Sequence, residues 1–107
     1  MSKNTKLQGL LCTKNELTSL DLRKNTALEE LYCSENKLTS LDVSKNTALS
    51  EVACTLGKLT APALNALFKT LHDNYVKNGK KTIYIQENPG RFECNRSIAE
   101  AKGWTVH

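Results

Sequence analysis

Four cysteines and two histidines are the residues of this 107-residue chain with the most specific chemistry. Cys12, Cys33 and Cys54 follow one another at intervals of 21 residues, and Cys94 stands apart. Zinc ligands usually come in closely spaced pairs, so this spacing does not fit a zinc site. The two histidines assemble no catalytic group with these thiols, and we expect neither enzymatic activity nor a cofactor.

The cysteine interval is the period of a repeat that covers the first half of the chain. Segments that begin at residues 2, 23 and 44 align with one another, and the first two are identical at 12 of 21 positions. Such agreement predicts units that stack and bury apolar groups only against their neighbours. The unit reads Leu-x-x-Leu-x-Cys-x-x-Asn-x-Leu, as from Leu28 to Leu38, and Gly57 interrupts the asparagine column in the third unit.

This pattern resembles the leucine-rich repeat, and its cysteine-containing form is similar to repeats of bacterial surface proteins of the Bacteroidetes type. The resemblance implies an α/β solenoid. It would be a right-handed superhelix of leucine-rich repeats, with a parallel β-sheet on the concave face and a helical C-terminal cap. The resemblance also implies recognition of a partner, and a cell-surface or secreted location.

The three regularly spaced cysteines are expected in the core. Leu31 and Cys33 lie two positions apart, so both point to one face of a strand. On strands about 4.8 Å apart, equivalent side chains run parallel, which does not favour disulfides. We expect small apolar core groups, with a disulfide or metal site as the alternative. Cys94 is expected as a free thiol, with a disulfide to Cys54 as the alternative.

The repeats are expected over residues 1–59 and a capping region over residues 60–107. The segment "TAPALNALFKTLHDNY" predicts a helix at about 61–75, with Thr60 as its N-cap and His72 on its surface. A degenerate repeat strand is expected at about 82–86 and a short helix at about 96–102. Ser97 and Glu100 suggest a capping box for that helix, and a last strand is expected at about 104–106.

The net charge of +4 is too small and too scattered to predict nucleic-acid binding. Lysines 77, 80 and 81 form the densest basic cluster, which we interpret as a solvated turn, with a polyanion contact as the alternative. No apolar run is long enough to predict membrane insertion of this segment.

The chain opens midway through a repeat, so we expect it to be a segment of a longer protein. An uncapped first repeat exposes apolar groups and an unpaired strand edge. We therefore expect self-association through residues 9–13 and the leucines at positions 7, 10 and 17.

Side chains on the outward face of the strands are the candidate binding surface. Tyr32 and Tyr84 are expected on this face with Ala53 between them, and aromatic groups with polar tips are common in recognition surfaces. The candidate ligand-binding residues are Glu30, Tyr32, Ser34, Glu51, Thr55, Tyr84 and Gln86. Two functions remain: binding of a protein or glycan through the concave face, or a structural capping or spacer end with no ligand.

Overall fold

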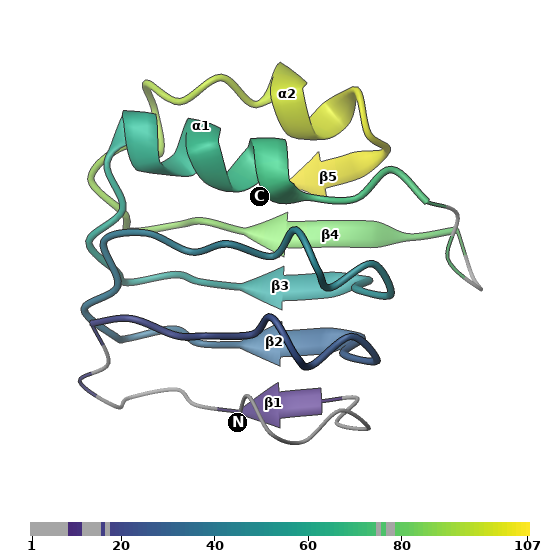
Figure 1. Cartoon of the computed structure of the whole chain (residues 1–107). Helices are drawn as coiled ribbons and strands as arrows, with labels where there is room; N and C mark the ends of the chain where they lie inside the picture. The colour runs from purple at the N-terminus through teal and green to yellow at the C-terminus, as the bar shows by residue number, and fades with distance from the viewer. Residues whose placement is uncertain (1–8, 12–15, 17, 75, 77–78) are drawn as a thin grey trace.

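Five short parallel strands form a single sheet in the computed structural model, which describes residues 9–11, 16, 18–74, 76 and 79–107. The strands are β1 (Gly9–Leu11), β2 (Glu30–Tyr32), β3 (Glu51–Ala53), β4 (Lys81–Tyr84) and β5 (Trp104–Val106). They follow one another across the sheet in chain order (Figure 1). Parallel neighbours need a crossover connection, which the return half of each repeat supplies. The predicted parallel sheet is confirmed.

The sheet register stacks equivalent positions of successive repeats. Leu31 pairs with Val52, which pairs with Ile83, and all three are fully buried. Cys33 and Cys54 are also buried, and both are free thiols, so the predicted core role is confirmed for these two. Cys94 is a free, half-buried thiol. The equivalent cysteine at position 12 lies outside the described residues, as do positions 7 and 17 of the expected self-association surface.

Buried asparagines satisfy backbone groups where the chain turns. The side-chain amide of Asn36 donates to the carbonyl of Cys33 at 3.1 Å. Asn46 donates across the repeat boundary to the carbonyls of Leu22 and Asn25, at 3.1 and 2.8 Å. Buried carbonyls that lack a donor are costly, so these amides hold the return segments in place.

Gly57 stands where the other repeats have asparagine, because the side chain of Asn88 occupies the space. The Asn88 amide donates to the carbonyls of Cys54 and Ile85, at 2.7 and 3.0 Å, and its oxygen accepts from the Leu59 amide at 3.1 Å. A Cβ at Gly57 would lie 2.6 Å from the Asn88 oxygen. One asparagine therefore serves two turns, and any side chain at position 57 must displace it.

Two helices lie at the C-terminal end of the stack, α1 (Ala61–Thr70) and α2 (Ser97–Glu100) (Figure 1). The Thr60 hydroxyl accepts from the Ala63 amide at the start of α1, as expected of an N-cap. Helix α1 buries Leu64, Leu67 and Phe68. It packs against α2, and α2 packs against β5.

Helix α1 ends at Thr70, not near residue 75 as expected, since Leu71 adopts an extended conformation with ψ 138°. The ammonium group of Lys102 binds the last carbonyls of the helix. It donates to Phe68, Lys69 and Leu71 at 3.3, 2.6 and 2.8 Å. A cation at a helix C-terminus satisfies carbonyls that have no intrahelical partner and complements the helix dipole. Nothing in the local sequence indicated this distant donor.

The expectation that His72 is a surface residue on the helix was wrong. His72 lies beyond the end of α1 with only 9% of its surface exposed. Its Nε2 is 2.7 Å from the Leu49 carbonyl, its Nδ1 accepts from the Asn74 amide, and its ring meets Trp104 edge-on. Because a carbonyl can only accept, these bonds assign the proton to Nε2. The ring links the helix end to the third repeat.

The last strand spans 104–106 as expected, but two other elements differ at their ends from the expected bounds. Strand β4 spans 81–84 rather than 82–86, and α2 spans 97–100 rather than 96–102. The expected capping box of Ser97 and Glu100 is not formed, because Asn95 accepts from both the amide and the hydroxyl of Ser97. Gly103 follows α2 with φ 85°, a left-handed conformation that glycine adopts without strain.

Candidate functional site

The exposed strand face is the outward side of the sheet: two rows of residues that cross the strands, and the residues that directly follow the strands on the same side. The first row runs from Glu30 through Glu51 to Thr82. The second runs from Tyr32 through Ala53 to Tyr84. This register is the one that the sequence predicted for the two tyrosines, and it brings them onto the same side of the sheet.

The hydroxyl of Tyr32 lies between two carboxylates. It is 2.6 Å from Oε1 of Glu51 and 3.0 Å from Oε2 of Glu30. The hydrogen bond to Glu51, burial and the hydrogen bond to Glu30 together raise the pKa of the Tyr32 phenol above its ordinary range. The sequence placed these three side chains on one face, but it gave no indication that the phenol joins them.

Tyr84 is held from the side of β5. Its ring stacks on the imidazole of His107, with centroids 5.2 Å apart and planes inclined by 18°. The backbone ladder continues past β5, since His107 donates to the Ile83 carbonyl and accepts from the Ile85 amide. Sequence reasoning missed His107 as part of this face. Its position directly after the expected last strand, two residues after the outward Thr105, was the available signal.

Ser34, Thr55 and Gln86 form the third part of the exposed strand face. The Ser34 hydroxyl accepts from both the amide and the hydroxyl of Thr55, at 3.2 and 2.9 Å. These bonds link adjacent repeats directly after their strands. Oε1 of Gln86 is buried and has no hydrogen-bond partner within the described part of the chain. The candidate residues thus divide into a tyrosine–glutamate cluster, a stacked aromatic pair and a hydroxyl pair.

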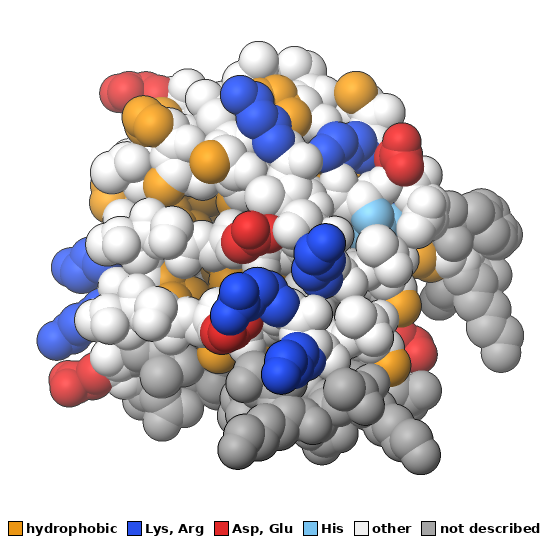
Figure 2. All heavy atoms as spheres, in the orientation of Figure 1, with side chains coloured by type: hydrophobic (Ala, Val, Ile, Leu, Met, Phe, Trp, Pro, Cys, Tyr) orange, Lys and Arg blue, Asp and Glu red, His pale blue; other side chains and the backbone are white. Residues whose placement is uncertain are grey.

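Charge is distributed unequally between the two sides of the sheet. Among the described outward residues of the strands, Glu30 and Glu51 carry charge, and none is lysine or arginine. The opposite side carries the return segments, which face the viewer in Figure 2, and lysine and arginine side chains gather there. Arg23, Lys24 and Lys45 are exposed members of this set. The exposed strand face is therefore acidic in a chain whose net charge is +4.

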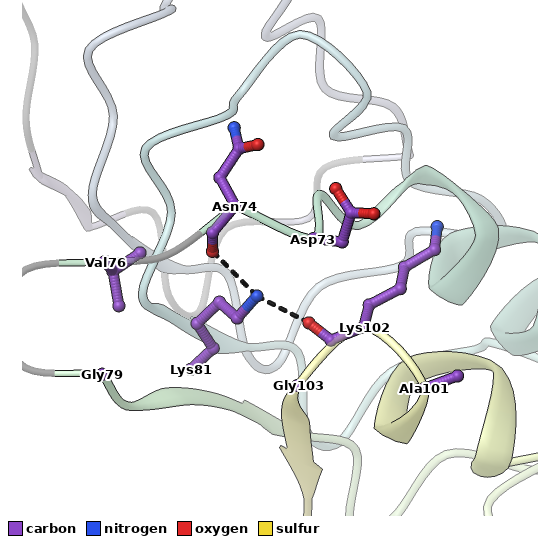
Figure 3. Close-up of a pocket in the computed structure, with 8 residues that line it drawn as sticks. All are labelled: Asp73, Asn74, Val76, Gly79, Lys81, Ala101, Lys102 and Gly103. Carbon is purple, nitrogen blue, oxygen red and sulfur yellow. Dashed lines mark hydrogen bonds between the residues drawn. The ribbon is translucent and has the colours of Figure 1, made fainter.

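A second candidate is a surface pocket of about 460 Å³ beside the C-terminal segments (Figure 3). Lys81 points into it, but its ammonium group already donates to the carbonyls of Asn74 and Lys102 at 2.9 and 2.6 Å. Burial lowers the pKa of Lys81, and the nearby Asp73 partly opposes that effect. The interpretation of this lysine as part of a solvated turn was wrong, because its amine ties three chain segments together.

Two large apolar side chains are exposed after the strands. Leu56 is half exposed and has a left-handed backbone with φ 55°, as do Glu35 and Glu87 at the equivalent positions. Phe92 is 82% exposed and lies 4.4 Å from the guanidinium of Arg91. Left-handed conformations are costly for residues other than glycine. The repeated position shows that this cost belongs to the turn geometry of the repeat.

Within the described residues, no cluster of three or more histidine, cysteine, aspartate or glutamate side chains is placed to hold a metal ion. No helix in the described part of the chain has the length and apolar character needed to cross a bilayer.

Comparison with known proteins gives a structural relative. Neither a family model nor a curated protein matches the chain. A solved structure that does match is the functional domain of InlJ from Listeria monocytogenes, described as including a cysteine ladder. The two superpose with a TM-score of 0.62 and 24% sequence identity, over 98% of this chain and 27% of that one. At this identity the likeness shows the fold alone, and that fold is a cysteine-containing leucine-rich repeat.

Proposed function

We propose that this chain is a non-enzymatic interaction module that binds a protein or glycan through its exposed strand face. The observation that carries the proposal is the row in which Tyr32 and Tyr84 flank Ala53. Both tyrosines are only partly buried, and both helices lie at the end of the stack (Figure 1). Aromatic groups with polar tips are enriched in recognition surfaces, so this row is suited to anchor a ligand.

The wider setting is part of the same proposal. The chain spans 27% of the length of the InlJ domain that it resembles. We infer that it belongs to a larger bacterial surface or secreted protein. Its sheet would then line the concave side of a right-handed superhelix, where a partner can contact several repeats at once.

A second candidate is a purely structural end piece. It is favoured by α2, which packs on the last strand, by α1, which packs on α2, and by Lys102, which joins α1 to the segment after α2. Terminal units of repeat proteins need such a cover for solubility. In this case the C-terminal region would be a helical cap, and the exposed strand face would have no ligand.

Binding by wild-type protein and a Tyr32→Ala/Tyr84→Ala double variant on protein and glycan arrays separates the two candidates. A Lys24→Ala/Lys45→Ala variant, altered on the opposite side, is the matched control. We expect the tyrosine variant to lose a ligand that the control retains, with both variants unfolding at the wild-type temperature within a few degrees. Absence of any ligand, or a ligand indifferent to both tyrosines, would favour the structural end piece.

A further inference from the structure

The carboxylates of Glu30 and Glu51 compete for the single hydrogen of the Tyr32 hydroxyl. A phenol carries one hydrogen, and an ionised carboxylate can only accept. Both carboxylates lie within hydrogen-bond distance of the hydroxyl, so it can donate to one of them at a time. Glu30 and Glu51 are also directly opposite each other on adjacent strands, where like charges repel. An added donor with positive charge would stabilise this arrangement.

The residues that the structure describes form no salt bridge that supplies that charge. Neither carboxylate takes part in a salt bridge within the described residues. Lysine and arginine side chains are seen on the opposite side of the sheet, with the return segments (Figure 2), and Arg23, Lys24 and Lys45 are exposed in those segments. Within the described residues no cation is paired with these carboxylates, so a cationic ligand would complement this face.

The row of Tyr32, Ala53 and Tyr84 indicates which shape of ligand group would fit this face. His107 stacks on the face of the Tyr84 ring that is turned toward β5, so the opposite face of the ring is turned toward β3. There Ala53 carries only a methyl group, and Tyr32 follows one strand further on. Two strand spacings amount to about 9.6 Å. A flat cationic group can enter above Ala53, lie against an aromatic ring and still reach the two carboxylates.

We propose that the exposed strand face binds an arginine side chain of a protein partner. Its guanidinium donates to Glu30 and Glu51 and lies against the tyrosine row above Ala53. Arginine fits better than lysine, because its planar fork can serve two carboxylates at once and stacks on aromatic rings. This inference rests on the proposed binding function and names the chemistry of the ligand.

The test is an array of peptides, each with a central arginine and matched copies that carry lysine or uncharged citrulline there. The probes are the wild-type chain, a Glu30→Gln/Glu51→Gln variant and a Glu35→Gln control, which changes an exposed glutamate in the turn after β2. We expect at least tenfold stronger retention of arginine peptides than of citrulline peptides. That preference should vanish in the double variant and remain in the control.

A second test does not depend on peptide context. Ethylguanidinium chloride is titrated into the protein, and the NMR signals of the tyrosine rings are monitored. We expect ethylguanidinium to cause saturable shifts of the Tyr32 ring signals, with an affinity at least tenfold lower in the Glu30→Gln/Glu51→Gln variant. Ethylammonium chloride and sodium chloride at equal ionic strength are the controls. Equal responses to all three salts, or to both proteins, would overturn the inference. Ligands that bind the face without an arginine would also overturn the inference, but they would leave the proposed function standing. If the arrays yield no ligand, both proposals fail.

Discussion

Replacing Asn88 with alanine should destabilise the protein strongly, because one side chain satisfies three buried backbone groups. The substitution removes the bonds to the Cys54 and Ile85 carbonyls and to the Leu59 amide. At about 1 kcal/mol each, with the groups left unpaired, the loss is about 3 kcal/mol. For a domain of this size that corresponds to a decrease in melting temperature of about 12–24 °C.

A double-mutant cycle with Gly57 tests whether the mechanism is correct. In the wild-type background, Gly57→Ala places a Cβ 2.6 Å from the Asn88 oxygen and should cost about 1–3 kcal/mol. In the Asn88→Ala background the contact is gone. The same change should then be neutral or stabilise by about 0.5 kcal/mol, through the lower entropy of the unfolded chain. Gly57→Ala should therefore destabilise the wild-type background and leave the Asn88→Ala background unchanged or slightly more stable. Such a difference between backgrounds indicates direct coupling of the two residues.

Urea unfolding, followed by the fluorescence of the single tryptophan, measures all four proteins. Trp104 is 2% exposed and packs in the C-terminal region, so unfolding will expose it to water. The midpoint should fall in Asn88→Ala with little change in the slope of free energy against urea. A loss of less than about 1 kcal/mol, or a Gly57→Ala effect of equal size in both backgrounds, would refute this account of the turn.

Three further outcomes are expected. Burial raises the pKa of the Cys54 thiol to about 12, so alkylation at pH 8 without denaturant should leave it unmodified by mass spectrometry, and rapid modification would contradict its burial. The pKa of Tyr32 is raised in the folded state, so its contribution to stability should persist below about pH 10 and decline as pH rises through the folded pKa. Ultraviolet titration should show that Glu51→Gln lowers that pKa, and an unchanged value would contradict the hydrogen bond. Lys102→Met should lower the free energy of unfolding by about 1–3 kcal/mol, because carbonyls at the end of α1 lose their donor. An exposed-lysine variant such as Lys58→Met should have little effect, and equal losses in the two proteins would argue against the cap.

The repeat period was sufficient to predict the sheet and most of the candidate face. Units of equal length stack in one register, which places Leu31 and Val52 in one buried row, and the Ile83-x-Ile85-x-x-Asn88 motif places Ile83 in the same row after a longer interval. The same reasoning placed Tyr32 and Tyr84 on the outward side with Ala53 between them. Within the periodic region, a position in one repeat predicts the position of its equivalent in the next.

The C-terminal region was predicted less well, because it lacks that period. His72 and Lys81 were expected at the surface, and both are buried by segments that come from elsewhere in the chain. The end of α1 depends on Lys102, which lies more than thirty residues away. Helix propensity and local capping patterns contain no information about a donor brought in by tertiary packing.

The sequence by itself determined the stacking of the repeats, the buried cysteine positions and the side of the sheet on which the tyrosines lie. These follow from strand alternation, the 21-residue period of the first three repeats and the matching motif of the fourth strand, all of which can be read from the sequence. Tertiary structure alone decided that the Tyr32 phenol joins two glutamates, that His107 stacks on Tyr84, and that Asn88 fills the space above Gly57. Each of these contacts depends on the reach and rotamer of a side chain between neighbouring repeats. That geometry exists only once the strands have been brought to their spacing in the sheet.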